Sequence, residues 1–63
     1  MNKENFEALY AKFSGWHKVD LELKLFDLKK QIATMVAIED LPNLTEQAEV
    51  IETILKERDN GAQ

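Results

Sequence analysis

The 63-residue chain contains no cysteine, only two glycines and one proline, and no long run of apolar residues. Without cysteine, disulfides and thiolate metal sites are excluded. The apolar runs are far shorter than the roughly 18 residues of a membrane-spanning helix. The first fifteen residues do not resemble a signal peptide, because they already carry Lys3, Glu4, Glu7 and Lys12. We therefore expect a cytoplasmic protein that does not contact membranes.

Residues that usually carry catalysis are also scarce. The chain has a single histidine and no glycine-rich loop. One imidazole with scattered carboxylates is a poor ligand set for a metal ion. The sequence predicts that the protein is not an enzyme and holds no cofactor or metal.

The size and the charge of the chain further restrict the class of protein that we expect. With 44% hydrophobic and 32% charged residues, the chain has the composition of one folded domain. Sixty-three residues lie near the lower limit for a domain that folds alone, so self-association or partner binding would matter for its stability. The net charge of −4 disfavours non-specific binding to nucleic acid.

The first stretch with helical periodicity covers residues 3–14. Its larger apolar residues recur at i, i+3, i+4 and i+7, which places them on one helical face: Phe6, Leu9, Tyr10 and Phe13. Asn2 or Asn5 is a candidate N-cap, and Gly15 is the expected stop.

The stretch VDLELKL, residues 19–25, alternates apolar and charged side chains as a half-buried strand does. No second alternating segment offers a partner strand within the chain, and only pairing between two copies would keep that alternative open. Residues 21–35 contain a heptad pattern with spacings of 4, 3, 4 and 3, formed by Leu21, Leu25, Leu28, Ile32 and Met35. We therefore predict a helix over about 17–38, with a second apolar row, Val19, Leu23 and Phe26, widening its apolar face.

Pro42 marks the clearest break, because it lacks an amide hydrogen and disfavours helical geometry at Leu41. Asn43 followed by Glu46 fits a capping box. A third helix is predicted over about 44–59, with a frayed tail at 60–63 after Gly61. Its seam continues the heptad spacing with Leu44, Ala48, Ile51, Leu55 and Arg58, flanked by Val50 and Ile54.

These elements predict an all-α fold in a single domain: a short helix, a long helix and a third helix. The short connection should make the last two an antiparallel αα-hairpin. Either the first helix or a second copy must cover that hairpin, giving a three-helix bundle or a dimeric helical bundle. We expect a homodimer, with a self-association seam formed by Leu21, Leu25, Leu28, Ile32, Met35, Leu44, Ile51 and Leu55.

Two groups of residues are candidates for binding a partner. Trp16, the only tryptophan, extends the row of Phe6 to Phe13 and is expected either in the core or as an exposed anchor; Tyr10 and His17 lie near it in sequence. The second group is an acidic row formed by Glu46, Glu49, Glu52 and Glu57. These carboxylates would dock a basic surface of a partner. Alternatively, they only complement the helix dipole and keep the protein soluble.

Two functions follow as hypotheses. The first is a small acidic helical module that binds and modulates a larger protein, as accessory and inhibitor proteins of bacteria and phages do. The second is a dimeric nucleic-acid regulator, because the chain resembles the plasmid RNA-binding Rop type in length and hairpin layout. That resemblance implies a basic helix face, for which the candidates are Lys3, Lys12, Lys18 and Lys24. The acidic third helix makes nucleic acid the less favoured partner.

Overall fold

The computed structural model describes residues 3–34 and 38–61. They form three helices, α1 (Lys3–Ser14), α2 (Lys18–Ala33) and α3 (Leu41–Gly61), with a short 3-10 helix, η1 (Ile38–Asp40), before the last. The predicted all-α fold is confirmed. Residues 19–25 are helical, so the strand alternative for this stretch is wrong.

Helix α1 has the predicted bounds and the predicted apolar face. Phe13 is fully buried, while Phe6, Leu9 and Tyr10 pack against the core with partial exposure. The Trp16 amide donates a hydrogen bond to the Phe13 carbonyl at 3.0 Å, which forms a tight turn after the helix. Asn5 lies inside α1 and therefore does not cap it; the other candidate cap, Asn2, is outside the described residues.

Helix α2 ends at Ala33, about five residues before the predicted end at 38. Thr34 has extended backbone angles, with ψ at 179°. Its amide still donates to the Lys30 carbonyl at 3.0 Å, and its hydroxyl donates to the Gln31 carbonyl at 3.1 Å. A threonine that bonds the preceding turn in this way competes with continuation of the helix. Met35, the last residue of the predicted seam, lies outside the described part.

Helix α3 begins at Leu41, three residues earlier than predicted, and is the longest helix at 21 residues. Pro42 lies in its first turn, where a missing amide hydrogen removes no helical hydrogen bond. Asn43 is consequently inside the helix, and the predicted capping box with Glu46 is wrong. The helix also includes Gly61 instead of stopping before it.

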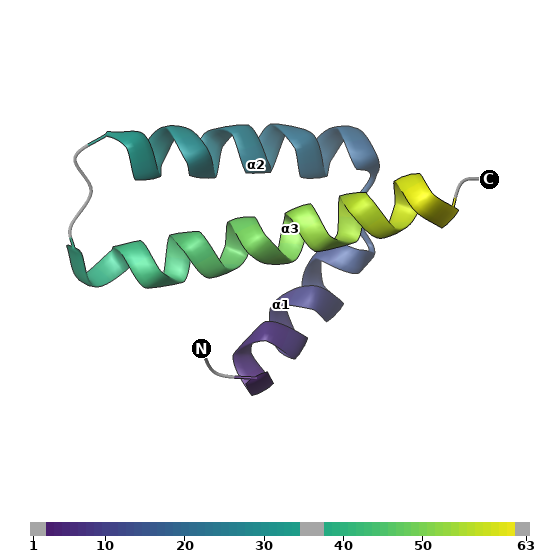
Figure 1. Cartoon of the computed structure of the whole chain (residues 1–63), viewed down its shortest axis with the longest axis horizontal. Coiled ribbons are helices and arrows are strands. Elements are labelled where there is room, and N and C mark those ends of the chain that lie inside the picture. Colours follow the sequence, from purple (N-terminus) through teal and green to yellow (C-terminus); the bar gives the residue numbers. More distant parts are fainter. Residues whose placement is uncertain (1–2, 35–37, 62–63) are drawn as a thin grey trace.

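The three helices are arranged around α3. Helices α2 and α3 run antiparallel as the predicted hairpin, and α1 crosses α3 on its other side (Figure 1). Helices α1 and α2 each pack against α3 and have little direct contact with one another. The first helix of the same chain thus covers the hairpin, which is the three-helix alternative.

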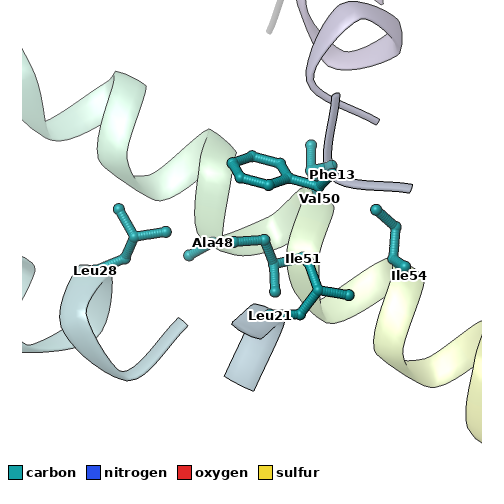
Figure 2. Close-up of a cluster of buried hydrophobic side chains, with 7 residues drawn as sticks. All are labelled: Phe13, Leu21, Leu28, Ala48, Val50, Ile51 and Ile54. Atoms are coloured by element: carbon teal, nitrogen blue, oxygen red, sulfur yellow. The ribbon is translucent and has the colours of Figure 1, made fainter. Parts of the chain in front are cut away.

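The core lies between α3 and its two neighbours (Figure 2). It consists of one residue of α1, two of α2 and four of α3: Phe13, Leu21, Leu28, Ala48, Val50, Ile51 and Ile54. The remaining described seam residues, Leu25, Ile32, Leu44 and Leu55, pack against this cluster. The described residues of the predicted seam therefore pack within one chain.

Candidate interaction surface

The second apolar row of α2 does not join the core. Val19, Leu23 and Phe26, here called the outer row, are 63%, 65% and 72% exposed. Each lies two residues from Leu21, Leu25 or Leu28, and a two-residue step rotates a side chain by about 200° around a helix. The outer row therefore lies on the side of α2 that faces away from α3, and its predicted contribution to the buried face is wrong.

A cavity of about 570 Å³ adjoins the outer row at the corner between α1 and α2. Six residues line it: Gly15, Trp16, His17, Asp20, Leu23 and Lys24. Trp16 is half-buried, with its ring edge-on to Phe13 at a centroid distance of 4.9 Å and an angle of 79°. The indole thus packs against the core and also lines this open cavity. Because Leu23 belongs to both features, Trp16 and the outer row form one apolar surface.

The charged residues of α2 nearly balance. Four lysines (18, 24, 29 and 30) oppose three carboxylates (20, 22 and 27), which gives +1 for this helix against −4 for the chain. Gln31 donates a hydrogen bond to Asp27 at 2.7 Å, and the exposed pair Lys29–Glu52 is 3.9 Å apart. Such an exposed pair contributes little to stability. The apolar surface is therefore bordered by charges of both signs.

The four glutamates of the predicted acidic row do not share one surface. Glu46 is only 8% exposed and accepts a hydrogen bond from Asn5 of α1. Glu57 accepts one from the Tyr10 hydroxyl, also on α1. Glu52 instead approaches Lys29 of α2, while Glu49 is exposed. The α1-facing positions, 46 and 57, are eleven residues apart, which returns a helix to nearly the same side.

Tyr10 is half-buried and is held toward α3, away from the cavity that Trp16 and His17 share. The hydrogen bond to Glu57 raises the pKa of Tyr10 above its ordinary value of 10.0. Ionisation would remove the donor and place two negative charges side by side. Of the three aromatic and histidine candidates, the structure therefore brings only Trp16 and His17 together.

A second cavity, of about 650 Å³, lies between the first turns of α1 and α3. Its lining is partly acidic and comprises Asn5, Glu39, Leu41, Pro42, Asn43, Thr45 and Glu46. No group of three or more histidine, cysteine or acidic side chains within residues 3–34 and 38–61 is placed to hold a metal ion.

The candidate nucleic-acid lysines are distributed over two helices. Lys3 and Lys12 belong to α1, and the Lys12 ammonium lies 5.3 Å from the centre of the Phe13 ring. Lys18 and Lys24 belong to α2, where Lys24 lines the corner cavity together with Asp20.

Sequence reasoning does not identify the outer row as a site, because it predicts that these residues widen the buried face of the helix. The alternation in VDLELKL contained the signal, since in a helix it places apolar side chains on two nearly opposite sides. A helix with two apolar sides needs a neighbour on each, and the described chain supplies one.

The chain matches no protein-family model, no curated protein and no solved structure at a significant level. Within the described residues, none of the helices combines the length and apolar character needed to cross a membrane.

Proposed function

We propose that this protein is a non-catalytic interaction module that binds a larger protein through the outer row of α2 and the adjoining Trp16 cavity, and modulates that protein's activity. The observation that carries the proposal is the exposure of three large apolar side chains in one row of one helix. Scattered exposed apolar residues are ordinary on a protein surface, whereas a contiguous row beside a half-buried tryptophan is typical of an interaction site.

The geometry supports recognition of α2 by an apolar groove. Amphipathic helices dock in this mode through residues spaced by three and four positions, as Val19, Leu23 and Phe26 are. Complete burial of one such side chain contributes about 1.5–3 kcal/mol before the costs of association are subtracted. The mixed charges along α2 favour a groove whose rim also carries both signs.

The same proposal includes a cytoplasmic location and an accessory role of the kind found in small bacterial and phage proteins. The chain builds its core without disulfides, on which small secreted domains usually depend. No catalytic activity is part of the proposal, which requires only a surface that a partner can cover.

A capture experiment tests the function. The chain, immobilised through its C-terminus, is exposed to an extract of its source organism in four forms: unchanged, Leu23→Asp, Phe26→Asp and Ile38→Asp. Ile38 is 87% exposed and outside α2, so its substitution is a matched control for adding a carboxylate to an exposed apolar position. Circular dichroism confirms that each variant is folded.

We expect one protein to be retained by the unchanged chain and by Ile38→Asp, and lost with both α2 variants. The retained protein, once purified, should bind with an affinity that Leu23→Asp lowers by on the order of 100-fold. Equal retention by all four forms would contradict the proposal.

The antiparallel α2–α3 hairpin is the observation that favours the alternative, a nucleic-acid regulator of Rop-like layout. Its charge distribution favours that function less, because α3 carries five carboxylates against one lysine and one arginine. If RNA is the ligand, a gel-shift assay would show binding that weakens steeply with salt and is reduced by Lys18→Ala and Lys24→Ala.

A further inference from the structure

The surface area of the chain indicates that one face lacks a cover. A compact 7.3 kDa protein exposes about 4,200 Å², whereas this chain exposes 4743 Å². The radius of gyration is 12.0 Å, against about 10.6 Å for a compact chain of this length. Among the described residues, α1 and α2 lie on different sides of α3, and no helix packs on the outer side of α2.

The outer row also continues as a heptad pattern along α2. Val19, Leu23, Phe26, Lys30 and Ala33 have spacings of 4, 3, 4 and 3, which is the repeat of a helix that pairs with another helix. A single lysine at such a position lowers the stability of a helix pair and selects its register. The row therefore has the pattern of a short pairing seam about 24 Å long, given the rise per residue of a 16-residue helix.

We infer that a second copy of this chain covers the outer row, with the two α2 helices antiparallel across a two-fold axis that passes between Leu23 and Phe26. The inference rests on the proposed function in that it uses the same surface. In the free protein the second copy covers the row, and a larger partner has to displace it.

Side-chain matching favours this antiparallel register. Leu23 of each copy meets Phe26 of the other at the centre of the pair. Val19 meets the aliphatic stem of Lys30, whose ammonium reaches toward Asp20 of the second copy. A parallel pair would instead place the two Lys30 side chains together in the seam.

Charge along one edge of α2 is self-complementary in the antiparallel arrangement. Glu22 of each copy lies opposite Lys29 of the other, and the two-fold axis produces this pair twice. A parallel pair would bring Glu22 beside Asp27 of the second copy, which is repulsive. On the other edge Asp20 and Asp27 approach across the interface, where Lys30 and the hydrogen bond from Gln31 to Asp27 offset their repulsion.

The available area is sufficient for a specific but modest dimer. An interface that covered an area equal to the excess over a compact chain, roughly 550 Å² per copy, would bury roughly 1,100 Å² in total. A specific interface buries at least about 1,000 Å², and weak, exchangeable complexes lie at this end of the range. A dimer of this size is one that a larger partner could displace.

Native mass from light scattering, over a concentration series from about 1 μM to 1 mM, tests the inference. The unchanged chain and Ile38→Asp should approach twice the 7.3 kDa chain mass. Leu23→Asp and Phe26→Asp should raise the dimer dissociation constant by on the order of 100-fold or more, because each change occurs in both copies. A mass of 7.3 kDa throughout, or unchanged dimers in both α2 variants, overturns the inference.

A charge exchange tests the register independently of the apolar residues. Glu22→Lys and Lys29→Glu each create two like-charged contacts and should each weaken the dimer. The double variant restores the opposite charges and should recover most of the affinity. No recovery in the double variant would rule out the antiparallel register.

The two proposals fail in distinguishable ways. If the unchanged chain stays at 7.3 kDa while capture still depends on Leu23 and Phe26, the dimer is wrong and the interaction module stands. If the dimer forms and no protein is captured through this face, the dimer stands and the proposed function is wrong.

Discussion

The hydroxyl of Tyr10 on α1 donates a hydrogen bond to the carboxylate of Glu57 on α3, which joins two residues 47 positions apart in the sequence. Asn5 makes the corresponding bond to Glu46, at the other end of α1. The two contacts give the acidic residues of α3 a structural role, because they fix how α1 crosses the hairpin.

The raised pKa of Tyr10 predicts a change in titration when its partner is replaced. In Glu57→Gln the pKa should fall toward 10.0, since the neutral amide does not repel the phenolate. Ultraviolet difference spectroscopy can follow this directly, because the chain contains one tyrosine. An unchanged titration curve would show that the hydrogen bond is absent in solution.

The sign of the pH effect on stability follows from the same contact. A group whose pKa is raised by folding contributes its full stabilisation below the pKa of the unfolded chain, near 10. That contribution is lost as the pH rises through the higher folded value. Tyr10→Phe has no phenol to ionise, so its free energy of unfolding should not show the loss that Tyr10 causes at alkaline pH. Urea unfolding at several pH values measures this difference.

Leu21 and Leu23 form a matched pair for testing which side of α2 is buried. Leu21 is fully buried and Leu23 is 65% exposed. Leu21→Ala should lower the free energy of unfolding by about 2–4 kcal/mol, whereas Leu23→Ala should change it by less than about 0.5 kcal/mol. The comparison is made by urea unfolding at low micromolar concentration, where a weak dimer contributes little; equal losses would mean that α2 is rotated.

Substitution of Asn5 and of Asn43 tests whether Glu46 bonds to Asn5, as observed, or forms the predicted capping box with Asn43. Asn5→Ala removes a hydrogen bond to a buried carboxylate and should cost about 1–3 kcal/mol. Asn43 is exposed within the first turn of α3, so Asn43→Ala should have little effect. A loss of about 1 kcal/mol in Asn43→Ala alone would support the cap instead. Thermal unfolding monitored by circular dichroism measures both.

Arg58 connects the last turns of α3 to the end of α1. Its guanidinium donates to the Ser14 carbonyl at 2.8 Å, beside the corner that positions Trp16. Arg58→Ala should lower stability by about 1 kcal/mol and shift the emission of the single tryptophan toward that of exposed indole. Lys56→Ala, on the same helix and also exposed, is the control and should leave the emission unchanged.

Local patterns predicted the helices better than their ends. The row from Phe6 to Phe13 and the heptad from Leu21 to Ile32 were sufficient for α1 and α2, because spacing around a helix depends only on the chain itself. The boundaries depended on competing local bonds, as at Thr34, and on whether Pro42 ends one helix or begins the next. Proline is compatible with a position just after the end of one helix and with the first turn of the next, so the sequence pattern does not distinguish these two placements of Pro42.

The candidate site is predictable from the sequence only in part, because it consists of residues that the fold leaves uncovered. Residue type and position make Trp16 a candidate contact, whereas the predicted acidic row is divided because Glu46 and Glu57 accept hydrogen bonds from α1. Helical periodicity shows which residues share a side of α3, but not which helix covers that side.

The sequence by itself determined that this protein is helical, that Phe13 and Ile51 lie on the apolar faces of their helices, and that the last two helices form a hairpin. These properties follow from short-range periodicity and one short connection. Only the tertiary structure decided which apolar side of α2 is buried. Both sides are apolar, and the choice depends on how α3 and α1 pack, which is a long-range property. That choice leaves Val19, Leu23 and Phe26 on the surface, where we propose that a partner binds.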